Sequence, residues 1–209
     1  RTALDCWQFT IQPDVTPGLF DSKFGGLPYW PPALPYPADS AGEKLILLVQ
    51  INLEQIEADT PLPKTGLLQF FVGRGDSFGA DWGEDTSSGF RVVWHEQVDR
   101  TLTPGQVQAL GIPTHAGLDY WPVLQETAVT AQRTTTWMGP ADGGFDALFA
   151  QIWKEVTGQP PAKPDFQDFL EEPDREYVYD QLWSSGHRLL GWPCFVQYDP
   201  RETKSPYRT

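Results

Sequence analysis

The chain is organised around the stretch Ser22-Lys23-Phe24-Gly25-Gly26-Leu27-Pro28-Tyr29-Trp30-Pro31-Pro32. Its paired glycines permit positive φ and its prolines restrict φ, so the stretch predicts a stiff loop of defined shape. The prolines continue to Pro37 and favour polyproline-like backbone. Such a segment either packs against its own domain or docks into an aromatic groove on a partner.

Two apolar runs follow this loop, Leu45 to Leu53 and Leu67 to Val72. Apolar residues occupy both alternating faces of the first run, which is typical of a strand covered on both sides. We therefore expect it at the centre of a sheet, with the second run as another buried strand. Gln50 and Gln69 lie inside these runs, where an amide without hydrogen-bond partners costs about 1–3 kcal/mol. Each amide must therefore bond backbone or cross-strand groups, or line a polar ligand pocket.

The remaining periodic segments predict more strands early in the chain and helices later. Alternating apolar or β-branched residues predict strands at Leu4 to Gln12, Phe90 to Glu96 and Trp121 to Trp137. Three- and four-residue apolar steps predict an amphipathic helix from Phe145 to Val156, with shorter helical segments at 103–110, 165–170 and 175–183. Together these elements predict an α+β fold of largely antiparallel sheets with a few helices.

The formal charge of the 209-residue chain is −13, because 28 Asp and Glu outnumber 15 Lys and Arg. This balance argues against a nucleic-acid partner, because binding to phosphates needs clustered basic side chains. It fits either solubility or recognition of a basic protein partner. No apolar run approaches the roughly 18 residues of a membrane span, and no lysine-led signal region opens the chain. We therefore expect a cytoplasmic protein with no membrane partner.

The sequence lacks the usual markers of metal and cofactor sites. Cys6 and Cys194 lie near opposite ends of the chain and are either two reduced thiols or one bridge. The three histidines are widely separated and form no His-Glu-x-x-His pair, so a zinc site is not expected. No glycine-rich phosphate loop is present. We expect neither a metal nor a cofactor.

One serine stands in a pattern known from hydrolases. Gly75-Asp76-Ser77-Phe78-Gly79 matches the Gly-x-Ser-x-Gly of a nucleophile elbow and follows an apolar strand. The elbow must launch a helix, whereas turn residues and a strand follow here. Asp119 and His187 complete the Ser, Asp, His order, but nothing in their surroundings singles them out. A tight acidic turn is the competing interpretation.

The same segment is acidic enough to suggest a cation site. Asp76, Asp81, Glu84 and Asp85 carry carboxylates, which calcium prefers as ligands. Their spacing does not follow an EF-hand loop. A solvated acidic turn explains them equally well. The segment from Asp76 to Asp85 therefore supports an alternative prediction, a hydrolase or a cation-dependent enzyme.

A short internal echo links the two ends of the chain. The six residues Lys23-Phe24-Gly25-Gly26-Leu27-Pro28 resemble Arg188-Leu189-Leu190-Gly191-Trp192-Pro193. Each has a basic residue, then two further positions, then glycine, an apolar residue and proline. Two half-domains that each begin with the same loop explain the echo, and coincidence over six residues is the alternative.

With these motifs the chain resembles the YwqG-like family of bacterial proteins, a domain of unknown function. The resemblance rests on Ser22 to Pro28, Gln50 to Leu53, Leu62-Pro63, Gly66 to Val72, Gly89 to Val92, His187 to Pro193, Gln197 and Asp199 to Arg201. It implies an α+β fold with internal duplication, an intracellular setting and no established activity. It also implies that 75–79 is an acidic turn and not a serine nucleophile.

The resemblance further implies one domain made of two half-domains. The first half would span about 1–140, and a helical connection and the start of the second half about 141–209. Family members continue after the Asp-Pro-Arg with another Gln-Ile-Asp strand, so the second half-domain is expected to be incomplete here. Some family genes lie among toxin and immunity genes, which would make the partner another protein.

We therefore expect a non-enzymatic binding or protein-interaction domain, with an immunity role as one possibility that the resemblance raises. Loops at corresponding positions of a duplicated fold often meet where clefts form. The predicted ligand-binding residues lie beside the two Gly-apolar-Pro loops and are Lys23, Gln50, Gln197 and Arg201.

Overall fold

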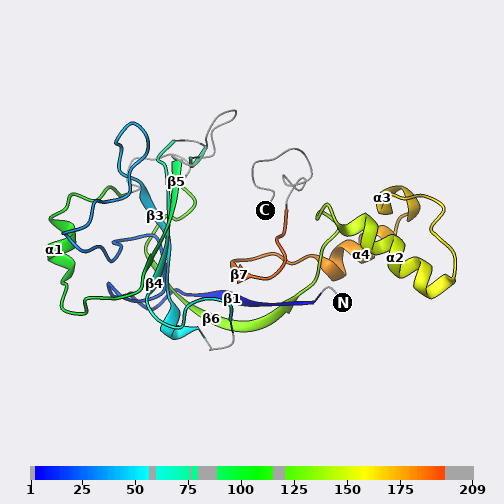
Figure 1. Ribbon diagram of the computed structural model, residues 1–209, viewed down its shortest axis with the longest axis horizontal. Helices are drawn as coiled ribbons and strands as arrows, with labels where there is room; N and C mark the ends of the chain where they lie inside the picture. Colours follow the sequence, from blue (N-terminus) through cyan, green and yellow to red (C-terminus); the bar gives the residue numbers. More distant parts are fainter. Residues whose placement is uncertain (1–2, 57–59, 76, 80–88, 115–120, 196–209) are drawn as a thin grey trace. The chain divides into compact units, whose positions relative to one another are not determined.

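The computed structural model describes residues 3–56, 60–75, 77–79, 89–114 and 121–195 (Figure 1). In these residues the fold is α+β, as predicted. The strands are β1 (Leu4–Gln12), β2 (Lys23–Phe24), β3 (Ile46–Asn52), β4 (Leu67–Val72), β5 (Phe90–His95), β6 (Thr127–Thr136) and β7 (Arg188–Leu190). The helices are α1 (Pro104–Gln108), α2 (Phe145–Thr157), α3 (Phe166–Phe169) and α4 (Asp174–Leu182), with a 3-10 turn at Leu53–Gln55.

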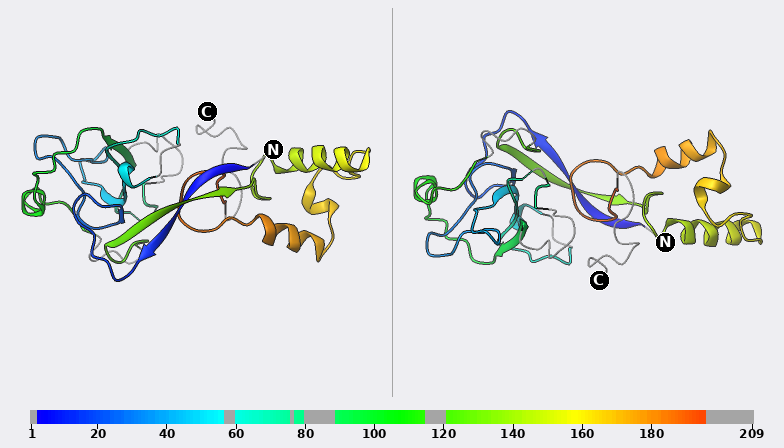
Figure 2. Two further views of the ribbon diagram at one scale, coloured as in Figure 1. Left: turned by 90° about the horizontal axis from the view of Figure 1, so that it is seen from below. Right: turned by 90° about the horizontal axis from the view of Figure 1, so that it is seen from above.

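The described strands form one mostly antiparallel sheet in the order β5-β4-β3-β2-β6-β1-β7. Strand β3 is therefore interior, as its two apolar faces predicted. The chain divides into two compact units, one formed by Phe9–Gln132 and the other by Arg1–Gln8 with Arg133–Thr209. Strands β1 and β6, which are neighbours in the sheet and can be followed in Figure 2, contribute residues to both units.

The core of the Phe9–Gln132 unit lies between strands β3 and β4 and the loop that follows β2. Tyr29 and Trp30 are buried in this loop and pack with Leu47, Leu67 and Phe71 of the strands. The Trp30 ring meets the Phe71 ring edge-on, with 5.8 Å between centroids. The start of the proline-rich loop is therefore packed against its own domain, whereas residues 32–35 are exposed, and docking of this part to a partner stays a prediction.

Helix α1 begins where the sequence predicted. The Thr103 side chain accepts a hydrogen bond from the Gln106 backbone N–H, and the Gln106 Oε1 accepts one from the Thr103 backbone N–H. This capping box and Pro104 in the first turn fix the start of the helix. Val107 of α1 is buried in the same core as Tyr29.

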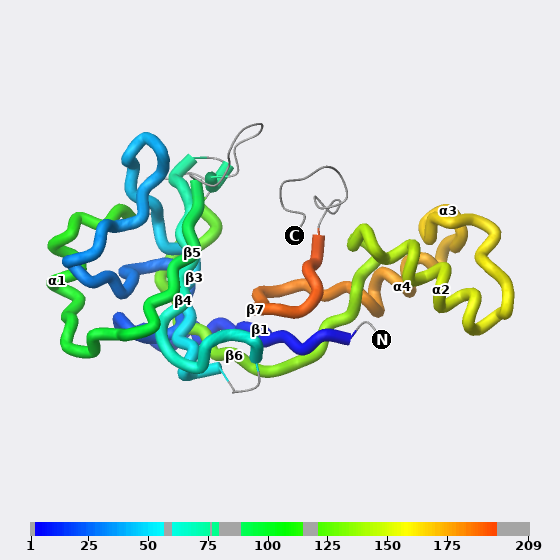
Figure 3. Tube along the Cα trace, viewed as in Figure 1, coloured from blue at the N-terminus to red at the C-terminus, as the bar shows by residue number. Residues whose placement is uncertain are grey.

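The second unit holds the three later helices, which follow one another in the yellow to orange part of the trace (Figure 3). Helix α2 agrees with the predicted helix from Phe145, and it ends at Gly158, whose φ is 76°. Phe145 and Phe149 of α2 pack against Phe166 of α3, with ring centroids 5.0 and 5.5 Å away. Aromatic side chains therefore cover the first part of the apolar face that predicted this helix, whereas Ile152 and Val156 further along it are exposed.

Strand β7 pairs with β1 in the same unit, with Cys6 opposite Leu190. Cys6 is buried and Cys194 is partly exposed, and both thiols are free. Of the two alternatives left open by the sequence, the structure has two free thiols and no bridge between Cys6 and Cys194. Among the helices of the described residues, none has the length and apolar content that a membrane crossing requires.

Strand β6 differs from its predicted range, Trp121 to Trp137, because it starts only at Thr127. Pro122 has no backbone N–H to donate to a strand neighbour. Residues Val123 and Glu126 instead lie against Gly25 and Gly26. The segment before β6 is thus a covering loop, and tertiary contacts outweigh its high β propensity.

The internal echo has a local counterpart in the backbone. Gly25 and Gly26 follow β2 with φ values of 62° and 75°, and Leu190 and Gly191 lie at the end of β7 with φ values of 64° and 79°. Two consecutive left-handed residues therefore occupy corresponding places in the two motifs. This agreement covers only the turn, and duplication of the half-domains stays a prediction.

Two glycines with positive φ allow a test of close backbone packing. A Cβ on Gly66 (φ 98°) would lie 2.2 Å from the His95 carbonyl oxygen, whereas a Cβ on Gly42 (φ 83°) would meet nothing within 4 Å. We expect Gly42→Ala to cost about 1–2 kcal/mol of unfolding free energy through strain alone. Gly66→Ala should cost more, on the order of 3 kcal/mol, because the backbone of β5 must also move. Urea unfolding measures both, and equal losses would contradict the close approach.

Candidate functional site

Lys23 lies in the interior strand β2, opposite Gln50 of β3 and Ala128 of β6. Its side chain is only 1% exposed. The Nζ donates a hydrogen bond to Glu126 Oε1 at 2.7 Å and another to the Gly18 carbonyl at 3.2 Å. Burial lowers the pKa of Lys23, and the Glu126 carboxylate opposes this shift. Lys23 is therefore a buried cation held by one carboxylate.

The turn after β2 lets Glu126 reach this lysine. A Cβ on Gly26 would lie 2.2 Å from Glu126 Oε1, and a Cβ on Gly25 would lie 2.8 Å from Val123 Cγ1. Both glycines also have positive φ, which side chains with a Cβ rarely adopt. The Gly25-Gly26 pair is thus required for the backbone turn and for the space in which Glu126 lies.

Gln50 is fully buried and binds the backbone of the loop around it. Its Oε1 accepts from the Tyr29 N–H at 2.9 Å, and its Nε2 donates to the Leu19 and Asp21 carbonyls at 2.9 and 3.0 Å. Gln69 Nε2 donates to the Tyr29 carbonyl and to Gln50 Oε1, both at 2.8 Å. Of the two interpretations of Gln50 and Gln69, pairing with backbone and cross-strand groups is confirmed.

His95 extends this amide pair. Its Nε2 lies 3.0 Å from Gln69 Oε1, and because Gln69 Nε2 is already a donor, His95 Nε2 carries the proton. The imidazole meets the rings of Tyr29 and Trp30 edge-on, each with 5.1 Å between centroids. Burial lowers the pKa of His95 to about 4, so the ring is neutral near pH 7.

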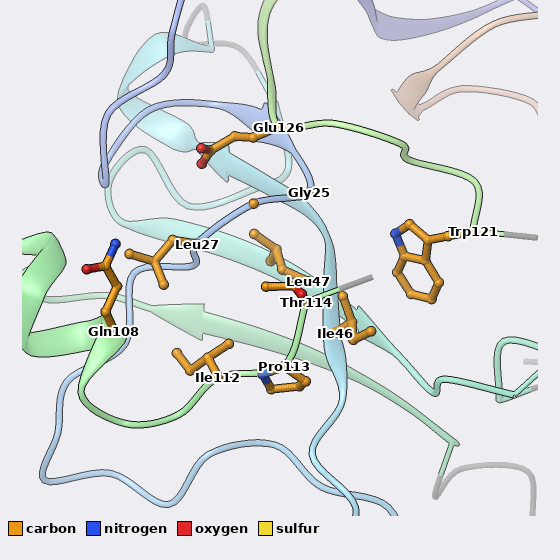
Figure 4. A pocket seen from close by; sticks show the side chains of 11 residues that line it. Gly25, Leu27, Ile46, Leu47, Gln108, Ile112, Pro113, Thr114, Trp121 and Glu126 are labelled. Carbon is orange, nitrogen blue, oxygen red and sulfur yellow. The ribbon is translucent and has the colours of Figure 1, made fainter. Parts of the chain in front are cut away.

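A cavity of about 300 Å³ opens beside the Gly25-Gly26 turn (Figure 4). Its apolar walls come from the loop after β2, from β3 and from the segment after α1, and they include Leu27, Ile46, Leu47, Ile112 and Pro113. Four side chains with polar groups also line it, namely Gln108, Thr114, Trp121 and Glu126. Two other cavities in the described residues have only about 10 Å³ each and leave no room for a small molecule.

The predicted site residues have different positions relative to this cavity. Lys23 and Gln50 are neighbours across β2 and β3, but neither lines it. Lys23 reaches it only through Glu126, which is 32% exposed. Gln197 and Arg201 lie outside the described residues, so the predicted cleft between the two loops is not placed.

Sequence reasoning missed the polar residues that do line the cavity. Glu126 and Trp121 fall inside a segment predicted as strand, and Gln108 in one predicted as helix. No motif marks any of them. The available signal was the Gly25-Gly26 pair, which indicates that another part of the chain approaches closely.

The serine pattern forms a tight turn in the described residues. The Phe78 N–H bonds the Gly75 carbonyl at 2.9 Å, and Ser77 to Gly79 are turn rather than the first turn of a helix. Asp119 and the acidic residues Asp76, Asp81, Glu84 and Asp85 lie outside the described residues. Within the described ranges, no three His, Cys, Asp or Glu side chains gather closely enough to hold a metal ion.

The fold and the site define an α+β protein, built on a mostly antiparallel sheet, with a buried amide network behind a small cavity. The chain belongs to the DUF1963 family, described as a domain of unknown function, whose sequence profile matches residues 22–209. No curated protein matches the chain. The matched range includes Gln50, Gln69, His95 and every residue that lines the cavity.

The neutral His95 predicts a pH dependence of stability. The unfolded chain protonates this residue near its ordinary pKa of about 6.5, whereas the native protein does so only near 4. The unfolded state therefore binds more protons between these values, and the His95 contribution to stability falls by about 2 kcal/mol from pH 7.5 to pH 5. We expect His95→Phe to remove this part of the pH dependence in urea unfolding. His187→Phe, at an exposed position, should keep it, and parallel pH curves for all three proteins would refute a neutral His95.

The Lys23–Glu126 pair predicts unequal effects of removing either charge. Glu126→Gln leaves a buried ammonium without its counterion and should cost about 2 kcal/mol or more of unfolding free energy. Lys23→Met should cost less, because the partly exposed Glu126 can regain water. The double variant should resemble Lys23→Met alone. Denaturant unfolding of the wild type, the two single variants and the double variant tests this prediction. If Lys23 is not held as a cation, Lys23→Met should cost more unfolding free energy than Glu126→Gln.

Proposed function

We propose that this chain is a non-enzymatic binding domain, with its ligand site in the cavity beside the Gly25-Gly26 turn. The supporting observation is the cavity itself, which combines apolar walls with a few polar groups from separate elements. Sites for small molecules have this composition, and a volume of about 300 Å³ corresponds to the small end of their range. The ligand is therefore of metabolite size.

The rigid surroundings of the cavity support the same proposal. Gly25 N–H bonds the Leu48 carbonyl at 2.9 Å, and Gln50 ties the following Tyr29 to the sheet. The Lys23 Nζ donates a hydrogen bond to Glu126 Oε1 and so fixes this carboxylate at the cavity wall. A wall that is fixed before binding loses little conformational freedom when a ligand enters, which favours affinity.

Another protein is the second candidate partner. The supporting observation is the edge strand β5, on which Phe90, Val92 and Trp94 alternate and are all exposed. The acidic charge of −13 fits a basic partner. An immunity role, suggested by the resemblance to the YwqG-like family, would use such a surface.

The resemblance also supports narrower statements that we propose with it. These are membership of the YwqG-like group, a cytoplasmic location, and one duplicated domain divided near residue 140. The shared left-handed turns at Gly25-Gly26 and Leu190-Gly191 support the duplication. The hydrolase or cation-dependent alternative gains no supporting observation from the described residues.

Blocking the cavity tests the proposed site. Thr114 lines it and is exposed, so Thr114→Trp should fill its mouth without disturbing the core, and Gln108→Trp from α1 provides an independent block. In a thermal unfolding screen of neutral fragments, a ligand at 100 times its Kd should stabilise the wild type by about 2.7 kcal/mol. Both blocked variants should lose this stabilisation, and Gln97→Trp, at an exposed position away from the cavity, should retain it. If no fragment stabilises the wild type, or if blocking changes nothing, the proposed site is wrong.

A further inference from the structure

Helix α2 has an apolar face that α3 covers only along one side. The Trp153 ring of α2 meets the Phe169 ring of α3 with 4.6 Å between centroids. Leu148, Ile152 and Val156 follow one another at four-residue steps and so form a separate row along the helix. Leu148 is half-buried, whereas Ile152 is 48% exposed and Val156 79%. The C-terminal half of α2 therefore presents aliphatic side chains to solvent, and we call these three residues the α2 row.

Helix α4 leaves the α2 row uncovered. All residues of both helices are described, and α2 packs against α3 without a comparable contact to α4 (Figure 2). Helix α4 has an exposed aromatic ring of its own, because Tyr177 is 66% exposed. Asp174 and Asp180 lie three residues before and after Tyr177, on the same side of the helix. This exposed ring thus has carboxylates as neighbours.

The segment that holds these helices is strongly acidic. Between residues 145 and 182 there are nine Asp and Glu and three Lys and Arg, so this segment carries a net charge of −6 out of the −13 of the chain. Two of the three cations are already engaged, because Arg175 pairs with Glu172 and the Lys163 Nζ donates to the Asp168 carbonyl at 2.8 Å. Four further carboxylates are exposed and form no ion pair within the described residues, namely Glu171, Asp174, Glu176 and Asp180.

This charge limits what can cover the α2 row. A second copy of the chain, an anionic lipid surface and a nucleic acid are all negative and would be repelled. An uncharged apolar segment would desolvate Glu155, which lies three residues after Ile152, without offering it a counterion. A segment with Lys and Arg beside an apolar face meets neither obstacle, because it covers the row and pairs with the carboxylates.

We propose that the α2 row docks a basic amphipathic helix of another protein. The apolar side of this helix packs on Ile152 and Val156, and its Lys and Arg side chains face the surrounding carboxylates. A helix fits better than a strand, because the backbone of α2 is hydrogen-bonded internally and offers no ladder to a strand. Leu148 to Val156 spans about 12 Å, which corresponds to roughly two turns of the partner. None of these residues lines the cavity or belongs to β5, so the proposal does not depend on the ligand site.

Two probe peptides of about 18 residues, each with equal numbers of leucine and lysine, test the proposal with the full chain. One has its leucines at helical spacing, so that a helix carries them on one face, and the other alternates the two residues, which favours a strand. In isothermal titrations the helical-period peptide should bind at least tenfold more tightly than the alternating peptide. Its affinity should fall as the salt concentration rises. The same peptide with glutamate in place of lysine should not bind.

A matched pair of double variants locates the binding surface. Ile152→Gln with Val156→Gln removes the exposed part of the α2 row while keeping good helix formers, and it should weaken the helical-period peptide at least tenfold. Ile11→Gln with Val15→Gln changes the same residue types at 48% and 53% exposure outside the helices, and it should bind like the wild type. Circular dichroism checks that the helix content of both is unchanged.

A second variant tests the electrostatic part independently of the row. Glu176→Gln with Asp180→Asn removes two exposed carboxylates of α4 and should weaken the peptide several-fold and reduce the salt dependence. The proposal is overturned if the alternating peptide binds as tightly as the helical-period one, because a strand edge is then the docking surface. It is also overturned if the Ile152 and Val156 double variant binds like the wild type, if the glutamate peptide binds equally well, or if the helical-period peptide does not bind.

Discussion

The amide of Gln50 is the constraint on which the arrangement of the Phe9–Gln132 unit depends. It bonds the backbone at Leu19, Asp21 and Tyr29, so one side chain fixes the loop on both sides of β2. Because the group is fully buried, each lost bond would leave a polar atom without water. The loop therefore has one position on the sheet, and the Gly25-Gly26 turn and the cavity wall are positioned with it.

Much of this fold could be predicted from local sequence, because the signals are local. Strands β3 and β4 are continuous apolar runs, helix α2 has apolar residues at three- and four-residue steps, and the Gln50 and Gln69 amides inside the apolar runs required buried partners. The ends of a strand are harder to predict than its existence, because they depend on contacts with distant parts of the chain. Strand β6 starts later than its composition predicts because Val123 and Glu126 pack against glycines about 100 residues earlier in the chain.

Only part of the candidate site could be predicted from the sequence. Lys23 was identified beside a conspicuous loop, but its partner Glu126 and the cavity residue Trp121 carry no motif, and only the folded chain brings them to the cavity. Lys23 itself is better understood as a support than as a binding group. It neutralises a carboxylate at the cavity wall and holds one of its two oxygens in place.

The acidic charge of the chain bears on the exposed apolar side chains of the edge strand β5. An edge strand with Phe90, Val92 and Trp94 facing solvent and no proline to interrupt it invites pairing with the same strand of another molecule. A net charge of −13 makes two such molecules repel each other before their edges meet. In the described residues no strand pairs with the outer side of β5, so charge repulsion between molecules is the property of this chain that opposes edge-to-edge pairing.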